Sequence, residues 1–336
     1  MTLGRESSAS AFRALSSACV SYSGPVIFAT PTGTRDVLGD ELRELRAITG
    51  ALRDVYEARG YGEVRTPAIE LDDVLRIGAG DIDPGYRVID DHGNVMALRP
   101  DMTVPIARVA ATRFAGAEPP LRFSYLENVY RAVNPHRGEA RELLQSGVEL
   151  FGPGAPDGTT EVLAVLCDAI AATGLTEFRI AVGSAAVFPR LLASHGVPEE
   201  ARPALLAALA AGDFVRFEAE VGDRGLAQEL IALARLRGDI DVLEQLPGDE
   251  AGGLATVLQS VDDAVRERIV VDLGLNRGFG YYTGAVFEVL HPAAGAALGG
   301  GGRYDELAGR FGRAMPAAGF AIDVQQLHNA LIAEEK

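Results

Sequence analysis

The sequence predicts an α+β fold, in which strands of antiparallel type form a sheet flanked by helices. Three observations support this class. Short apolar runs occur in pairs around polar turns, helical periodicity is grouped between these pairs, and an Ala- and Leu-rich stretch interrupts the strands at about residues 185–262. A doubly wound parallel sheet would instead alternate strands and helices along the chain. We interpret residues 185–262 as a helical insertion.

The helices are predicted from apolar residues that recur every three or four positions. The clearest one runs from Asp40 to Arg59 and ends at Gly60, because glycine favours the position after a helix C-terminus. Pro105 is compatible with the first turn of a helix, where its missing N–H would be unbonded anyway. The predicted helices span residues 40–59, 103–114 and 159–173, followed by the insertion, a helix after Asp305 and a C-terminal helix.

The strands are predicted from short apolar runs bounded by turn residues. Two such runs flank Asp91-His-Gly-Asn94, a pattern that indicates a β-hairpin. A proline closes the first predicted strand, and the polar loop 131–141 separates the two longest ones. The predicted strands span residues 63–69, 87–90, 95–98, 121–129, 143–151, 178–182, 269–273 and 285–290.

Composition excludes several classes of protein. The chain has 336 residues, 48% of them hydrophobic and 23% charged, which describes a globular protein of about two domains, or of one large domain with an insertion. A formal net charge of −16 opposes any role that depends on neutralising phosphates over a wide surface, so generic nucleic-acid binding is disfavoured. Cys19 and Cys167 provide neither a disulfide framework nor the paired spacing of a zinc site. We expect no metal and no cofactor.

Location and chain organisation follow from simple patterns. No apolar run reaches the roughly 18–20 residues of a membrane span, and the cysteine usage suits a reducing compartment, so we expect a soluble, cytoplasmic protein. Residues 1–25 are rich in Ser and Ala without a sustained apolar core, which predicts a disordered leader rather than a targeting peptide. Residues 26–336 then form the folded part.

The first polar cluster is Leu98-Arg-Pro-Asp-Met-Thr103, which follows a predicted strand and opens a predicted helix. The carboxylate of Asp101 and the hydroxyl of Thr103 together supply acceptors that a three-donor ammonium group needs. The pair is therefore a candidate ammonium site. A helix N-cap without any ligand is the alternative.

The second cluster lies on the strand pair 121–129 and 143–151. Gln145 and Glu149 are four residues apart and share one face of their strand. Polar groups on a core-facing strand are costly unless they meet a partner, which indicates a small polar ligand. An ordinary sheet with a solvated face is the alternative. Arg131 follows the first strand of the pair.

Two glycine-rich segments complete the set. Arg277-Gly-Phe-Gly-Tyr-Tyr-Thr-Gly284 combines glycines that allow close backbone approach with the rings of Tyr281 and Tyr282, and a hairpin without ligand is its alternative. The run Gly299–Gly302 is no Walker A loop, because no Lys-Ser/Thr follows it. It is no dinucleotide fingerprint either, because no strand–turn–helix unit surrounds it.

The order of these motifs over residues 30–336 closely resembles the catalytic domain of histidyl-tRNA synthetase, a class II aminoacyl-tRNA synthetase. The resemblance implies a class II synthetase-like antiparallel sheet flanked by helices, with a helical insertion between the second and third class II motifs. The segments that carry it include Arg99-Pro-Asp-Met-Thr103, Gln145-x-x-x-Glu149, Arg277-Gly-x-Gly-Tyr-Tyr-Thr-Gly284 and Gly300-Gly-Gly-Arg-Tyr-Asp305.

For the site, the resemblance implies an inherited histidine pocket without catalytic residues. The acid and the threonine of the first cluster match those that hold the histidine ammonium, and Glu149 matches a position placed for the imidazole. The motif 2 arginine is matched by Arg131, and the histidine-specific arginine by Arg277. The matching residues are, in chain order, Asp101, Thr103, Arg131, Gln145, Glu149, Arg277, Tyr281 and Tyr282.

The sequence departs from the synthetase pattern where ATP and tRNA are handled. Val133 replaces an acidic residue of motif 2, and Gly138-Glu-Ala-Arg141 stands where the family has Gly-Arg-x-Arg. Gln326 occupies the place of the motif 3 arginine that grips the triphosphate, and Gly280 replaces an aspartate beside the tyrosines. A neutral amide cannot replace a planar guanidinium, and Glu139 would repel phosphates. The chain also stops about where an anticodon-binding domain would begin, so we expect no such domain and no tRNA charging.

A synthetase paralogue with these losses resembles the regulatory subunits of ATP phosphoribosyltransferase, the enzyme of the first step of histidine biosynthesis. The resemblance implies a non-catalytic chain that forms dimers and joins the short catalytic subunit in a hetero-octamer of four plus four chains. It also implies L-histidine as feedback effector, bound in the inherited pocket or at the subunit interface. A shortened ligase that activates an amino acid, or a free-standing histidine-binding protein, is the alternative. Neither tRNA nor a membrane is an expected partner.

Overall fold

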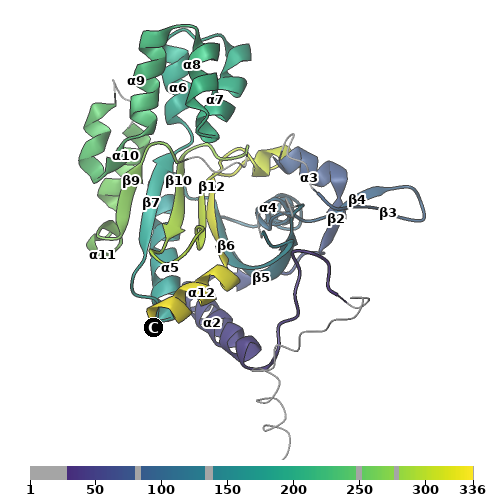
Figure 1. Cartoon of the computed structure of the whole chain (residues 1–336). Helices are drawn as coiled ribbons and strands as arrows, with labels where there is room; N and C mark the ends of the chain where they lie inside the picture. Colours follow the sequence, from purple (N-terminus) through teal and green to yellow (C-terminus); the bar gives the residue numbers. More distant parts are fainter. Residues whose placement is uncertain (1–28, 80–84, 133–138, 247–251, 276–279, 336) are drawn as a thin grey trace, which may run out of the picture.

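The computed structural model describes residues 29–79, 85–132, 139–246, 252–275 and 280–335 (Figure 1). Within these ranges, a nine-stranded sheet is antiparallel through its centre and has one parallel pair of strands toward each edge. The α+β class is thereby confirmed, with a mixed rather than purely antiparallel sheet. In spatial order the strands are β1 (Gly62–Glu63), β5 (Leu121–Tyr130), β6 (Glu142–Phe151), β12 (Ala317–Asp323), β11 (Gly299–Arg303), β10 (Ala285–Leu290), β7 (Arg179–Ser184), β9 (Ile269–Asp272) and β8 (Arg237–Gly238).

Long helices cover one face of this sheet: α2 (Gly39–Ala58), α5 (Asp157–Ala172) and α12 (Val324–Glu334), which lie together in Figure 1. In α2, the buried side chains Leu45, Ile48, Leu52 and Tyr56 recur at three- and four-residue intervals, as predicted. Gly60 follows the helix with a φ of +80°, a left-handed conformation that favours glycine. The helix thus forms where its apolar stripe can be buried.

The opposite face of the sheet carries a second apolar core beneath α4 (Thr103–Thr112). Helix α4 begins at the predicted residue and has Pro105 in its first turn. Its core side chain Ile106 packs in one cluster with Tyr125 of β5 and with Tyr281 and Tyr304. This is the face on which the candidate polar residues also lie.

A three-stranded sheet stands beside the large one, in the order β2 (Ile69–Leu71), β4 (Val95–Leu98) and β3 (Arg87–Ile89), with α3 (Asp72–Ala79) after β2. The predicted hairpin is confirmed by antiparallel β3 and β4. The single strand predicted over 63–69 is wrong, because β1 pairs in the large sheet and β2 in the small one. Pro67 lies between them and has no N–H with which to continue a ladder.

The stretch predicted as helical, residues 185–262, lies mainly beyond one end of the sheet (Figure 1). It also contains β8, a short strand that the sequence did not predict and that pairs antiparallel with β9. After it, α11 (Asp263–Arg266) leads into β9. Its helices are α6 (Val187–Ser194), η2 (Glu199–Ala201), α7 (Arg202–Ala210), α8 (Phe214–Val221), α9 (Arg224–Ala234), η3 (Ile240–Gln245) and α10 (Gly252–Ser260).

The C-terminal part differs from the prediction in two places. The glycine run forms β11, a central strand between β10 and β12, although glycine is a poor strand former. The predicted helix after Asp305 is replaced by one short 3-10 turn, η4 (Ala308–Phe311), because Gly312 adopts a φ of +102° that ends it. The C-terminal helix is present as α12.

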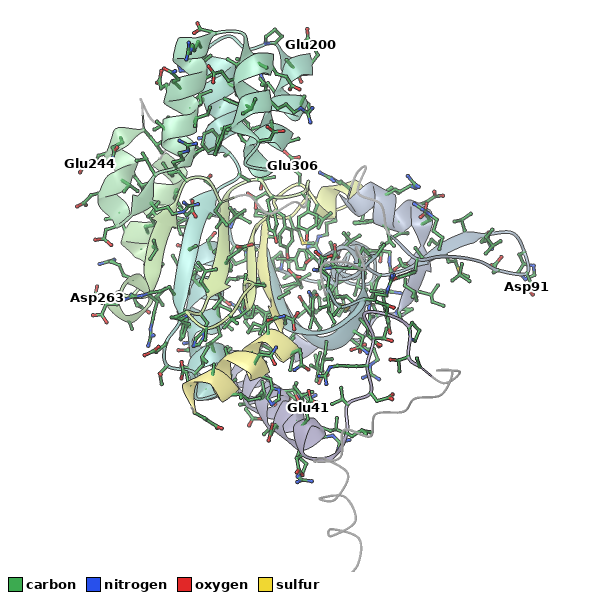
Figure 2. The ribbon with its side chains drawn as sticks, in the orientation of Figure 1. Glu41, Asp91, Glu200, Glu244, Asp263 and Glu306 are labelled. Atoms are coloured by element: carbon green, nitrogen blue, oxygen red, sulfur yellow. The ribbon has the colours of Figure 1, made fainter. Side chains whose placement is uncertain are left out.

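Many acidic side chains lie at the surface, where solvent screens them from one another. Figure 2 shows six of them at the outer surface of different elements: Glu41, Asp91, Glu200, Glu244, Asp263 and Glu306. None of the helices in the described ranges is long and apolar enough to span a bilayer.

Candidate functional site

A small cavity of about 20 Å³ lies on the α4 face of the sheet. It collects residues from the end of β4, the start of α4, strands β5, β6, β11 and β12, and the segment before β10. Seven of the eight predicted site residues belong to the described part of the chain, and six of these line the cavity. The lining is Asp101, Met102, Thr103, Tyr125, Arg131, Gln145, Tyr281, Tyr282, Gly300, Tyr304, Gly319, Phe320 and Ala321.

Asp101 uses its two carboxylate oxygens differently. Oδ1 accepts a hydrogen bond of 3.0 Å from the backbone N–H of Val104, so it caps the N-terminus of α4. Oδ2 is buried and has no hydrogen-bond partner among the described residues. Burial raises the pKa of the carboxyl, while the bond from Val104 and the charge of Arg131 oppose that rise. The capping role is thus present, and one oxygen remains for a ligand.

Thr103 and Glu149 form a hydrogen-bonded pair next to Asp101. The hydroxyl of Thr103 donates to Oε1 of Glu149 over 2.7 Å, and the phenol of Tyr304 donates to Oε2. Glu149 is fully buried, and burial raises the pKa of its carboxyl to about 8. The polar face predicted for β6 is therefore real, and its carboxyl already has two partners before any ligand arrives.

Glycine makes room for that carboxyl. A Cβ atom on Gly319 of β12 would lie 1.9 Å from Oε2 of Glu149, much closer than atoms can approach. Gly319 pairs directly with Glu149 across the ladder between β12 and β6. The position of the acid thus depends on a bare backbone on the neighbouring strand.

Arg131 and Gln145 contribute the remaining polar groups of β5 and β6. The Nε of Arg131 donates to the carbonyl of Pro100 over 3.2 Å, which ties the arginine to the segment that leads to Asp101. Its charge lowers the pKa of both Asp101 and Asp323, against burial, which raises them. Gln145 is buried and lines the cavity.

Tyrosine rings form the walls. The rings of Tyr281 and Tyr282 lie 4.9 Å apart, and that of Tyr304 lies 5.7 Å from Tyr281 and 6.4 Å from Tyr282. Tyr282 rests against the backbone of β11, since a Cβ on Gly302 would lie 2.9 Å from two of its ring carbons. The predicted pair of tyrosines is thus part of a larger aromatic enclosure.

Sequence reasoning missed Tyr125 and Tyr304 as site residues. Tyr304 comes two residues after the glycine run, so its place close to that motif was the available signal. Tyr125 stands opposite Gly147 in the β5–β6 ladder, and its hydroxyl donates to the carbonyl of Phe320 over 3.2 Å. Alternation along the strand could have placed Tyr125 on the same face as the predicted residues.

Arg99 is a further missed residue, which supports the segment before Asp101. It is 1% exposed. Its guanidinium donates to the carbonyl of Asn128 over 2.9 Å, to that of Thr66 over 2.6 Å and to Oε2 of Glu127 over 2.7 Å. The arginine thereby joins the end of β4 to β5 and to Thr66, which lies between β1 of the large sheet and β2 of the small one.

The positions that depart from the synthetase pattern are only partly described. Val133 lies outside the described residues, as does Arg277, which matches the pattern. Arg141 donates to the carbonyl of Thr32 over 2.6 Å and to the hydroxyl of Tyr86, so it holds the N-terminal segment. The backbone N–H of Gln326 donates to Oδ1 of Asp323 over 3.1 Å. Gln326 lines a different cavity from the one that contains Asp101.

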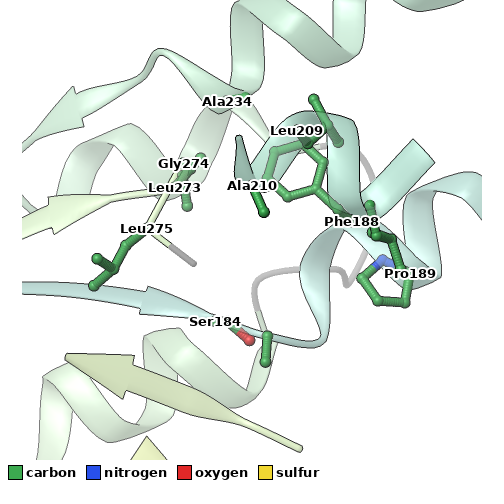
Figure 3. A pocket seen from close by; sticks show the side chains of 11 residues that line it. Ser184, Phe188, Pro189, Leu209, Ala210, Ala234, Leu273, Gly274 and Leu275 are labelled. Atoms are coloured by element: carbon green, nitrogen blue, oxygen red, sulfur yellow. The ribbon is translucent and has the colours of Figure 1, made fainter. Parts of the chain in front are cut away.

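A separate cavity, shown in Figure 3, contains none of the predicted site residues. It lies between α6, α7 and the ends of β7 and β9, and its volume is about 40 Å³. Apolar side chains such as Phe188, Leu209 and Leu273 surround it, and Ser184 is its one hydroxyl residue among those that line it. Among the residues that the structure describes, no group of His, Cys, Asp and Glu is placed to hold a metal ion.

Comparison with known proteins gives consistent results. The family model described as histidyl-tRNA synthetase matches residues 33–327. The ATP phosphoribosyltransferase regulatory subunit of Symbiobacterium thermophilum is 40% identical over 321 residues, which cover 91% of this chain and 80% of that protein. The one of Desulforamulus reducens is 38% identical over 312 residues, covering 89% and 78%.

Solved structures agree with these relatives. A protein of Bacillus halodurans described as an ATP phosphoribosyltransferase regulatory subunit/histidyl-tRNA synthetase superposes with a TM-score of 0.83 at 30% identity, covering 92% of this chain and 84% of that one. A histidine–tRNA ligase subunit of Alicyclobacillus acidocaldarius gives 0.76 at 32% identity, covering 92% and 98%. The chain belongs to the histidyl-tRNA synthetase-like family of ATP phosphoribosyltransferase regulatory subunits.

Proposed function

We propose that the chain is a non-catalytic regulatory subunit that partners the short catalytic chain of ATP phosphoribosyltransferase in histidine biosynthesis and conveys feedback by L-histidine. It acts in the cytoplasm as a dimer within a hetero-octamer, without tRNA. The names of the relatives support the partnership. The cavity that contains Asp101 supports the proposal that L-histidine binds this chain.

One observation carries the effector proposal: Oδ2 of Asp101 is buried without a partner in the described part of the chain. A buried carboxylate oxygen without a hydrogen bond is costly, so a ligand ammonium would stabilise it strongly. The faces of Tyr281 and Tyr282 attract a cation as well. Gln145, which lines the cavity, supplies a further polar group for the side chain of such a ligand, as imidazole requires.

The charges near Arg131 favour an amino acid over a nucleotide. Asp101 and Asp323 are both close enough for Arg131 to affect their pKa, so this guanidinium already faces two acids. A triphosphate would add negative charge beside them, and Gln326 carries no compensating charge. We infer that the chain does not activate amino acids with ATP. Histidine-dependent ATP–pyrophosphate exchange by the purified chain would contradict this and favour the shortened ligase.

Calorimetry with L-histidine tests the cavity. Asp101→Asn keeps an oxygen for the helix cap and removes the charge, so affinity should fall at least about tenfold, equivalent to 1.4 kcal/mol. Asp168→Asn is the matched control, because Asp168 pairs with Arg59 on the far side of the sheet and should leave affinity unchanged. Equal binding by wild type and Asp101→Asn would exclude this cavity as the histidine site.

A reconstituted assay tests the regulatory role itself. The chain is mixed with the short transferase, and formation of phosphoribosyl-ATP is measured with and without histidine. We expect the chain to raise the rate and to make it sensitive to histidine, because an effector that binds one state more tightly shifts the population toward it. No change in either quantity would refute the proposal.

A further inference from the structure

Three of the tyrosines that line the cavity of Asp101 come from two separate segments of the chain. Tyr281 and Tyr282 precede β10, whereas Tyr304 follows β11. Their rings are in contact, with centroids 5.7 Å apart for Tyr304 and Tyr281 and 6.4 Å apart for Tyr304 and Tyr282. The cavity therefore keeps its shape only if the two segments stay at a fixed distance from each other.

Thr283 connects these two segments through its backbone and its side chain. Its backbone N–H donates to the carbonyl of Arg303 over 2.8 Å. Its hydroxyl accepts a hydrogen bond of 3.0 Å from the backbone N–H of Asp305 and donates to the carbonyl of Arg303 over 3.4 Å. A hydroxyl can donate one bond and accept others at the same time. Thr283 thus bonds the peptide groups on both sides of Tyr304.

The backbone of Tyr304 is also held by β12, the strand on the other side of β11. The N–H of Tyr304 donates to the carbonyl of Ala317 over 2.8 Å, and the N–H of Ala317 donates to the carboxylate of Asp305 over 3.1 Å. That carboxylate also pairs with Arg303, which is buried. Tyr304 therefore lies between two sets of hydrogen bonds, one made by Thr283 and the other by Ala317.

Thr283 does not line the cavity, so it can influence a ligand only through its neighbours. Tyr282 precedes it in the chain, and Tyr304 lies between the two peptide groups that it bonds. The phenol of Tyr304 donates to Oε2 of Glu149, so a shift of this ring would also move a donor away from a buried acid. Because the cavity has a volume of only about 20 Å³, a small shift of either ring changes its shape.

We propose that Thr283 is a positioning residue for the ligand: its hydroxyl fixes the separation of Tyr282 and Tyr304 and thereby the affinity of the cavity for L-histidine. The inference rests on the proposed function, which names that ligand. Aromatic rings attract one another best at centroid distances of roughly 4.5–7 Å, and imidazole is a flat aromatic ring. The place of each tyrosine wall therefore affects how tightly such a ligand binds.

Calorimetry with L-histidine on the full chain tests this role. Thr283→Val nearly keeps the shape of the side chain and removes its hydroxyl, so the N–H of Asp305 loses its acceptor and affinity should fall about tenfold. Thr283→Ser keeps the hydroxyl and should bind within about twofold of wild type. Thr173→Val is the matched control and should leave affinity unchanged. The hydroxyl of Thr173 bonds the carbonyl of Ile170 at the end of α5, on the other face of the sheet.

A double-mutant cycle provides a readout that needs no ligand. If the hydroxyl of Thr283 holds Tyr304 in place, Thr283→Val should raise the equilibrium constant of urea unfolding about tenfold in the wild-type chain. The increase should be less than about threefold in a Tyr304→Phe chain, which has already lost the phenol bond to Glu149.

Three results would overturn the inference: equal effects of Thr283→Val in the two chains, wild-type affinity for L-histidine in Thr283→Val, or a Thr283→Ser chain that binds as weakly as Thr283→Val. Failure of the proposed function would look different. If the wild type binds no histidine while the cycle still shows coupling, the effector proposal is refuted and Thr283 still positions Tyr304.

Discussion

The hydroxyl of Thr103 donates a hydrogen bond of 2.7 Å to Oε1 of Glu149, although the two residues are 46 positions apart in the chain. The bond links the first turn of α4 to the centre of β6, so the helix and the sheet set the position of the acid together. The resemblance to synthetases implies that Thr103 holds a ligand ammonium. The hydroxyl of Thr103 instead bonds the neighbouring acid, so Asp101 offers the oxygen that is free of partners among the described residues.

Stability should depend on pH through Glu149. The pKa of this carboxyl is about 8 in the folded chain against a usual value of 4.5, so the folded state keeps a proton that the unfolded state has lost between these values. The free energy of unfolding therefore falls as pH rises from about 4.5 to 8, by at most on the order of 5 kcal/mol. Glu149→Gln should remove this loss. Urea unfolding of both proteins at pH 5, 7 and 8.5 checks it, and a difference that does not grow with pH would contradict it.

Tyr304→Phe should destabilise the chain by about 1–3 kcal/mol, because Oε2 of the buried Glu149 loses its donor. The pKa of Glu149 should rise further, since the phenol hydrogen bond now lowers it. The same change in a Glu149→Met background, which has no oxygen acceptor at this place, is the control for lost packing. If both backgrounds lose the same free energy of unfolding, the hydrogen bond contributes nothing.

Gly319→Ala should cost more than about 3 kcal/mol or prevent folding, because the added Cβ would lie 1.9 Å from Oε2 of Glu149 and 2.6 Å from the carbonyl of Val148. Gly253→Ala is the matched control. Gly253 lies in α10, and its Cβ would meet nothing within 4 Å, so alanine should be neutral or stabilise the helix by up to about 1 kcal/mol. Thermal unfolding of the two variants measures the contrast.

Arg99→Lys and Arg65→Lys compare two arginines that bind the same acid. Arg99 is buried and also serves three backbone carbonyls, so its replacement should cost about 3–5 kcal/mol. The side chain of Arg65 is 81% exposed in its pair with Glu127, and its replacement should cost less than about 1 kcal/mol. Equal losses in denaturant unfolding would show that burial does not separate the two pairs.

Local patterns predicted the elements whose shape depends on their own sequence. Helix α2 follows its apolar stripe, and the hairpin of β3 and β4 follows Asp91-His-Gly-Asn94, where Gly93 has a φ of +85°. Both signals act over a few residues. They are therefore visible without knowledge of the rest of the chain.

Features that depend on distant partners were predicted less well. Strand β11 is held by β10 and β12 on its two sides, and nothing in four glycines indicates that. The site residues came from the motifs, but the bond from Tyr304 to Glu149 joins positions 155 residues apart. Periodicity cannot reveal such a pair, because packing of separate elements brings it together.

The bare backbone beneath Tyr282 has a consequence for how ligand preference can change. Gly300 and Gly319 line the cavity, and Gly302 supports the tyrosine ring, so peptide groups rather than side chains form the floor. A floor of this kind has no rotamers to adjust, and almost any replacement would lift Tyr282 or displace Glu149. A preference for another small molecule can therefore evolve only through the side chains that line the cavity, while its glycine backbone stays unchanged.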